Sequence, residues 1–129
     1  MKIDVSIGEV VDKVSILEIK LEKMKDPEKR ANVEKEYAVL KKCLEEEGIS
    51  TESDDYKSLK EVNLTLWDIE DRIRIKEQQQ VFDEEFIQLA RSVYENNDER
   101  SVIKKRINLT HGSDFIEEKE YVNYKKRET

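Results

Sequence analysis

Apolar residues recur along most of the chain at intervals of three and four positions, the pattern of amphipathic helices. Ser6 and Glu9 have the spacing of a capping box at the start of the first such segment. Asp26 and Pro27 mark the start of the second, because aspartate caps a helix and proline fits its first turn. The predicted helices cover residues 7–25, 27–47, 54–80 and 84–111. The sequence therefore predicts an all-α fold, a bundle of four main helices.

The segment after the fourth predicted helix has a different character. Gly112 is a natural left-handed helix end, and residues 113–129 hold several apolar side chains. We expect this tail to form a short C-terminal appendage, helical or extended. The chain has 129 residues, which falls within the usual range for one domain. The sequence thus predicts a single helical domain over residues 1–129.

The apolar seams indicate how these helices pair. Those of the second and third helices alternate three- and four-residue spacings, as in coiled-coil-like packing. We therefore expect these two helices to form a long antiparallel hairpin. The first helix differs, because Ile16 and Ile19 lie away from its main apolar stripe. A helix covered on two sides is typical of a central helix or of one that meets a second subunit.

Composition narrows the class of protein. Charged residues make up 43% of the chain and the net charge is −7, with basic residues spread out, so nucleic acid is an unlikely bulk partner. The sequence shows no secretion signal and no membrane-spanning stretch, which favours a cytoplasmic protein. Cys43 and His111 are the only residues of their types, and no glycine-rich phosphate loop occurs. Conventional catalytic triads and P-loop enzymes are therefore excluded.

Polar side chains lie on helix faces where a plain bundle has apolar ones. Glu18 falls within the apolar arc of the first helix, where a carboxylate needs a cation, a hydrogen-bond network or water. In the fourth helix Asn97, Arg100 and Lys104 fall on the apolar arc if the helix is straight. A break at Asn97-Asp98 would instead return them to solvent. Both alternatives, a polar cleft and a solvated face, stay open.

The third helix carries a second stripe of candidate residues. Glu70 and Arg74 have the favourable orientation for an ion pair one turn apart, which is usually a weak surface feature. Trp67 lies among polar groups, as aromatic residues do in pocket walls and partner contacts. The candidate residues for a cleft or partner site between the first, third and fourth helices are Glu18, Asn63, Trp67, Glu70, Arg74, Asn97, Arg100 and Lys104.

Several blocks of the chain resemble a family of short, uncharacterised bacterial and phage proteins, a domain of unknown function. These blocks are IGEVVDK at 7–13, LWDIEDR at 66–72, Asn97-Asp98 with Arg100, and INL at 107–109 with Gly112-Ser113 and EEK at 117–119. The resemblance covers nearly the whole chain. It implies one intact domain and no particular activity.

A weaker similarity links the chain to the all-α nucleoside triphosphate pyrophosphatases, which hold magnesium between acidic residues one helical turn apart. Glu9 with Asp12 and Asp68 with Asp71 have that spacing. Carboxylates so placed can share a hard cation. The tighter acidic cluster of that family is not matched, and acidic pairs are common in a chain with 31 Asp and Glu.

The sequence therefore favours a non-enzymatic helical binding or adaptor module without a cofactor. We expect it to act on a protein partner or through self-association as a homo-oligomer, with no membrane partner. The alternative is a small Mg²⁺-dependent nucleotide pyrophosphatase, or an anion-binding enzyme, that uses the polar cleft.

Overall fold

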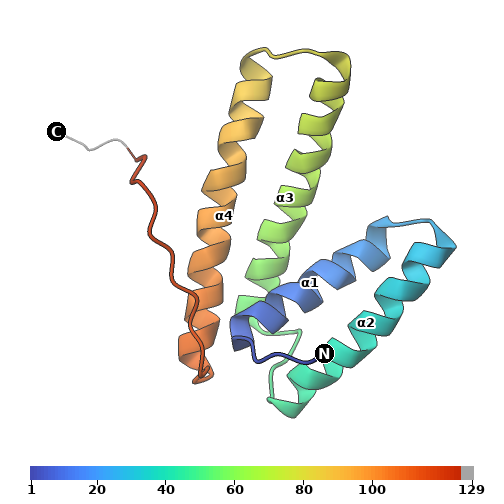
Figure 1. The fold of residues 1–129 in the computed structure, drawn as a ribbon, viewed down its shortest axis with the longest axis vertical. Helices are drawn as coiled ribbons and strands as arrows, with labels where there is room; N and C mark the ends of the chain where they lie inside the picture. The colour runs from blue at the N-terminus through green and yellow to red at the C-terminus, as the bar shows by residue number, and fades with distance from the viewer. Residues whose placement is uncertain (126–129) are drawn as a thin grey trace.

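The computed structural model describes residues 1–125, which form four packed helices and no strand (Figure 1). The helices are α1 (Ile7–Lys23), α2 (Pro27–Glu46), α3 (Asp54–Gln79) and α4 (Glu84–Thr110). The predicted all-α fold with four main helices is confirmed. None of these helices combines the length and apolar character that a membrane crossing needs.

Each helix begins at a short polar side chain that accepts a hydrogen bond from a backbone N–H of the first turn. The acceptors are Ser6 for α1, Asp26 for α2, Ser53 for α3 and Asp83 for α4. Such caps satisfy N–H groups that have no partner within the helix. The sequence sets where each helix starts largely through these four residues.

The central helix is α1, which packs against α2, α3 and α4. The predicted pairing of the second and third helices was wrong, because α2 packs against α1 alone among the helices and α3 pairs with α4. Helix α2 therefore packs on α1, whereas α3 packs on both α1 and α4. The buried core accordingly gathers residues from all four helices, including Val11, Val14, Leu44, Leu59 and Ile107.

Helix α4 is continuous through Asn97-Asp98, so the break considered above does not occur in the structure. Asparagine and aspartate each cost a helix only about 0.5 kcal/mol relative to better formers. Leu89 before this point and Ile103 and Ile107 after it are buried, and this packing outweighs that cost. As a result Asn97, Arg100 and Lys104 stay on the apolar arc of one straight helix.

The tail from Ser113 to Lys125 forms no helix and runs beside α4 (Figure 1). The Ser113 hydroxyl accepts a hydrogen bond from the Ile7 backbone N–H (3.0 Å), and the Tyr124 hydroxyl donates to Asp98 Oδ2 (2.6 Å). Of the two predicted forms, the extended one is present. Residues 126–129 of the predicted tail lie outside the described residues.

The hairpin of α3 and α4 extends beyond the point where α1 crosses it (Figure 1). A helix of 26 residues is about 39 Å long, so the far half of the hairpin forms a two-helix layer without a third helix over it. Ile75, Phe82 and Ile87 in this half are each about half exposed. The hairpin therefore consists of a near half covered by α1 and an uncovered far half.

Candidate functional site

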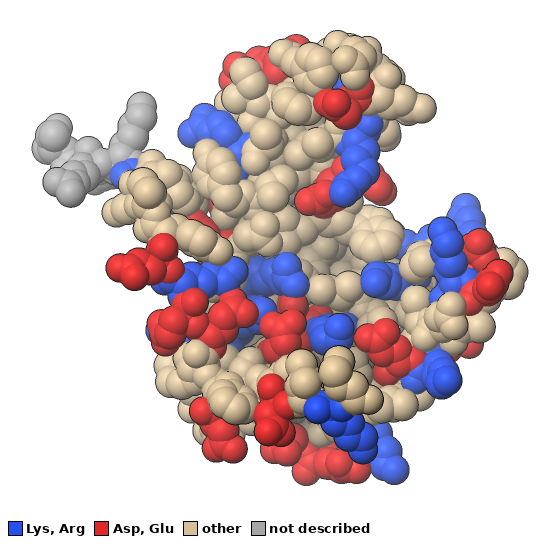
Figure 2. Space-filling view, in the orientation of Figure 1, with Lys and Arg blue, Asp and Glu red and all other residues tan. Residues whose placement is uncertain are grey.

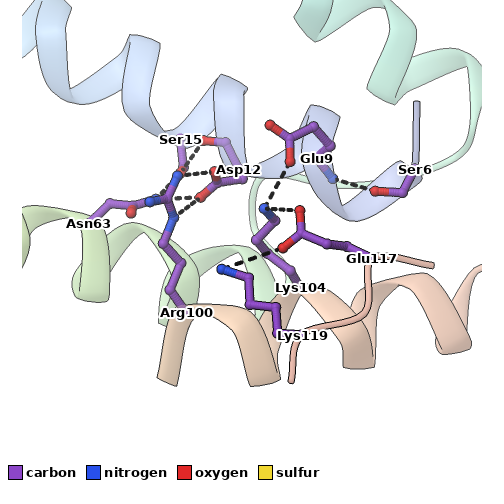
Figure 3. A network of polar contacts seen from close by, with 9 residues as sticks. All are labelled: Ser6, Glu9, Asp12, Ser15, Asn63, Arg100, Lys104, Glu117 and Lys119. Carbon is purple, nitrogen blue, oxygen red and sulfur yellow. Dashed lines mark hydrogen bonds and ion pairs between the residues drawn. The ribbon is translucent and has the colours of Figure 1, made fainter. Parts of the chain in front are cut away.

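Three helices meet at the carboxylate of Asp12, which is 1% exposed. Arg100 of α4 donates to both carboxylate oxygens, with Nε 2.9 Å from Oδ1, and the Asn63 amide of α3 donates to Oδ1 at 2.9 Å (Figure 3). The same amide donates to the Ser15 hydroxyl (2.9 Å), which in turn donates to the Asp12 backbone carbonyl (2.7 Å). No buried side-chain nitrogen or oxygen of this network lacks a hydrogen-bond partner.

The network joins a buried negative charge to a positive one on another helix. The hydrogen bond with Asp12 raises the pKa of Arg100 above its ordinary value, outweighing the opposing effect of partial burial. A buried ion pair is stable only when both charges and their remaining hydrogen-bonding groups are satisfied, as they are here. We therefore interpret Asp12, Asn63 and Arg100 as the link that fixes α1 across the hairpin.

A second polar cluster lies one helical turn away, beneath the tail. The buried Lys104 donates to Glu9 Oε2 (2.8 Å) and lies 3.7 Å from Glu117 of the tail, which Lys119 also approaches at 3.5 Å (Figure 3). Lys104 therefore lies beside a small polar hollow of about 220 Å³, apart from most of the other candidate residues.

The start of α1 packs unusually closely against α4. The Gly8 backbone N–H donates to the Asn108 side-chain oxygen at 2.6 Å, and a Cβ on Gly8 would lie 2.6 Å from the Lys104 carbonyl oxygen. Only glycine fits this approach. Sequence reasoning missed Gly8, Asn108 and Ser113 as contact residues. A glycine in the first turn of a helix was the available signal, since glycine is otherwise a poor helix former.

Glu18 lies away from both clusters. Its carboxylate accepts hydrogen bonds from Lys60 Nζ (2.6 Å) and from the Tyr56 hydroxyl, and Lys60 also donates to Glu22 (2.6 Å). Partial burial pushes the pKa of Glu18 upward, but these hydrogen bonds outweigh it and hold that pKa below 4.5. Glu18 thus forms an ion pair between α1 and α3 and does not line the predicted cleft.

Beside the Asp12 network lies an open hollow of about 510 Å³ between α1, α3 and α4. The structure places six of the eight candidate residues around it, which are Asn63, Trp67, Glu70, Arg74, Asn97 and Arg100. Its apolar part comes from Ile16 and Ile19 of α1 with Leu66 and Trp67 of α3. Sequence reasoning did not include four of the lining residues, which are Ile16, Ile19, Leu66 and Asp71. Helical periodicity indicated packing for the three apolar residues, and Asp71 was considered only as part of an acidic pair.

A second hollow of about 450 Å³ continues this one along α3. It shares Asp71 and Arg74 with the first and adds Ile75 and Gln78. Together the two hollows follow one side of α3 into the uncovered half of the hairpin. Figure 2 shows mainly uncharged surface over the upper half of the hairpin, whereas charged side chains crowd the lower half of the molecule.

Comparison with known proteins places the chain in a family. The model of the "Family of unknown function (DUF6165)" matches residues 1–126. The chain belongs to DUF6165. No curated protein and no solved structure matches it.

The charges around the larger hollow are largely engaged within the chain. Arg100 is bound to Asp12, and Arg74 donates to Glu70 on the same helix. The two arginines are balanced by Glu70 and Asp71 on the same rim. A balanced rim around an apolar floor does not concentrate the positive potential that an anionic substrate needs. Such a rim is instead complementary to a partner surface that carries both apolar and charged groups.

The four carboxylates of the proposed magnesium site are not brought together. Asp12 is bound by Arg100, Glu9 is paired with Lys104, and the exposed Asp68 lies 3.9 Å from Arg72. Within residues 1–125 no group of three or more metal-ligating side chains gathers. Glu9 and Asp12, which have the one-turn spacing of a magnesium-binding pair, are instead each paired with a cation of α4.

Proposed function

We propose that this chain is a non-enzymatic helical module that binds a protein partner through one face. We name it the open face, and it consists of Ile16, Ile19, Trp67, Asp71, Arg74, Ile75 and Gln78. The observation that supports the proposal most is the apolar hollow with Trp67 at its wall. This hollow lies where the hairpin extends past α1. A partner helix placed there would contact α3 on one side and the end of α1 on another.

The composition of the open face is that of a protein interface. Protein interfaces have an apolar centre, a polar rim and an enrichment in tryptophan and arginine. Here Ile16 and Trp67 supply the accessible part of the centre above the buried Ile19, while Asp71 and Arg74 supply the rim. A partner helix laid along α3 would contact positions spaced by three and four residues, as helix-in-groove complexes do. We expect the module to act in the cytoplasm of a bacterial or phage-infected cell.

The pyrophosphatase alternative has less support. It needs carboxylates that converge on a cation, whereas Asp12 and Glu9 are bound to Arg100 and Lys104. A direct assay with Mg²⁺ and nucleoside triphosphates separates the two functions. We expect no release of pyrophosphate. Release that is lost in Asp71→Asn but kept in the Asp55→Asn control would contradict the proposal and restore the enzyme.

Site-specific photo-crosslinking in cells tests the binding function. A photo-reactive amino acid is introduced at Trp67 or Gln78 on the open face, or at the exposed Lys35 and Glu45 of α2 as controls. We expect crosslinked protein adducts from positions 67 and 78 and none from the two α2 positions. Adducts from the α2 positions alone, or equal capture at all four, would refute the open face as the binding surface.

A further inference from the structure

The open face has the spacing of a helix-packing seam. Trp67, Asp71, Arg74 and Gln78 follow one another at intervals of four, three and four residues along α3. This alternation keeps the side chains of two long helices in register along a shared seam. The preferred occupant of the face is therefore another long helix that runs roughly parallel or antiparallel to α3.

The charges on this seam are complementary to themselves. If a second α3 packs antiparallel about a two-fold axis between positions 71 and 74, Asp71 of each copy lies opposite Arg74 of the other. The same axis sets Trp67 opposite Gln78. A two-fold interface repeats every contact, so the arrangement forms two ion pairs of identical kind. An antiparallel pair of α3 helices is thus matched in charge along its seam.

Both charged residues are available for such pairs. Asp71 is exposed and makes no ion pair with any of residues 1–125. Arg74 has a side chain that is 70% exposed, and its ion-pair partner within the described chain is Glu70 one turn away on the same helix. Pairs of this exposed, intrahelical kind contribute only about 0.3–0.5 kcal/mol. Arg74 can therefore exchange or share partners at little cost.

Packing favours the same occupant. The far half of the hairpin exposes Ile75, Phe82 and Ile87 and has no third helix over it. Two such hairpins placed together form a four-helix layer in which each supplies the cover that the other lacks. The tail lies on the side of α4 away from α3 (Figure 1), where it contacts Lys105, Asp98 and Tyr94, so it does not cover the open face on α3.

We infer that the partner on the open face is a second copy of this chain, bound through antiparallel α3 helices with Asp71 opposite Arg74 across a two-fold axis. This inference rests on the proposed binding function and specifies its partner.

Charge exchange between two variants tests the inference. Sedimentation velocity is run on the wild type, on Asp71→Arg and on Arg74→Asp, each at concentrations from 1 to 100 µM, chosen to span the ~µM range of typical self-association. The wild type is expected to dimerise. Each single variant places like charges opposite each other twice, so we expect its dimer dissociation constant to rise at least about tenfold. An equimolar mixture of the two variants restores both ion pairs and is expected to dimerise again.

Matched controls come from two positions away from the open face. The exposed Asp68 of α3 allows the same charge change as Asp71, and the exposed Lys35 of α2 allows a change from a basic residue to aspartate. Asp68→Arg and Lys35→Asp are expected to dimerise like the wild type, and circular dichroism should show the same helix content in every variant. Loss of dimer in these controls would mean that net charge, and not the seam, governs association, which would overturn the inference.

The remaining outcomes separate this inference from the proposed function. A wild type that stays monomeric at 100 µM, at the top of the tested ~µM range, would refute the second copy. Crosslinks from positions 67 and 78 to a different protein would then still support the binding function. A dimer that persists unchanged in both single variants would place the two-fold contact on another face and also refute the inference. Absence of both dimer and crosslinks would refute the two proposals together.

Discussion

Two arginines on facing helices show how the near and far halves of the hairpin differ. Arg100 has a side chain that is 28% exposed, and it binds a carboxylate 88 residues away on α1. Arg74 has a side chain that is 70% exposed, and it binds a carboxylate four residues away on its own helix. The first pair fixes the position of one helix on another. The second holds no helices together and leaves its face free for a partner.

The presence of α1 causes this difference. Where α1 crosses the hairpin it excludes water, so each polar group beneath it must find a partner within the protein. Among residues 1–125, no buried side-chain nitrogen or oxygen lacks a hydrogen bond. In the far half Lys76 pairs with Asp83 (2.9 Å) and Arg72 pairs with Glu85 (3.2 Å), but both carboxylates are about half exposed to solvent, unlike that of Asp12. The lesson is that an ion pair between helices stabilises the fold, whereas one within a helix is compatible with a binding surface.

The largest expected effect comes from removing the carboxylate at the centre of the near half. Asp12→Ala leaves the Arg100 guanidinium and the Asn63 amide without their acceptor. Breaking one side of a buried pair costs about 3 kcal/mol or more, so we expect the free energy of unfolding to fall by at least that amount. Urea denaturation followed by circular dichroism measures it. The control Asp68→Ala, at an exposed position, should change it by less than about 0.5 kcal/mol.

The close approach of α1 to α4 is tested by Gly8→Ala. On helix propensity alone this change would stabilise α1 by up to about 1 kcal/mol. The new Cβ would instead meet the Lys104 carbonyl oxygen, and we expect a net destabilisation of about 2 kcal/mol from the displaced backbone. A lower urea midpoint in Gly8→Ala would show that the steric contact outweighs the gain in helix propensity, and a higher midpoint would show the reverse. Gly48→Ala, where φ is +70° and space is open, serves as the control for backbone strain alone.

The ion pair of Glu18 with Lys60 is expected to make stability depend on pH. The folded protein holds the pKa of Glu18 below its ordinary value of 4.5, so the pair stabilises the fold above that pH. This stabilisation is lost as the pH falls through the lower folded pKa. Glu18→Gln should therefore unfold more easily than the wild type at pH 7, which lies above that ordinary value. The difference should shrink at progressively lower pH. A difference in unfolding free energy between the two proteins that stays constant from neutral to acid pH would contradict a stabilising role for ionised Glu18.

The smallest effect on stability is expected in the far half. Arg74→Gln removes the exposed pair with Glu70, and we expect the unfolding free energy of the isolated chain to change by less than about 0.5 kcal/mol. The measurement is made at a concentration low enough to keep the chain monomeric. A loss comparable to that of Asp12→Ala would show that the far half also depends on its charges, and the contrast between the two halves would fail.

Local sequence signals were sufficient for the helices and for part of the site. The caps at Ser6, Asp26 and Asp83 and the apolar periods predicted the four helices within one or two residues of their ends. The stripe containing Asn63, Trp67 and the Glu70–Arg74 pair could also be read from helical spacing, because it lies on one helix. Those properties depend on residues within a few positions of one another.

Contacts between distant residues could not be read in that way. Helical periods place Asp12, Asn63 and Arg100 each on a face, yet their meeting depends on which helices pair and where they cross. The predicted hairpin of the second and third helices failed at this step, since an apolar seam indicates that a helix face is covered but not which helix covers it. For the same reason, helical spacing could not show that Glu18 lies outside the hollow, or that Glu9 and Asp12 are paired with cations of α4.

The sequence by itself determined four helices, their starting caps and the faces on which polar side chains lie, because these follow from local hydrogen bonding and from the helical repeat. Only the tertiary structure decided that α1 crosses one half of the α3–α4 hairpin and leaves the other uncovered. The crossing helix buries side chains in the near half and leaves those of the far half exposed. Burial in turn determines whether a charged residue must be paired within the chain or remains available to a partner. For this reason Arg100 and Arg74 have different environments although the sequence placed both on the same predicted cleft.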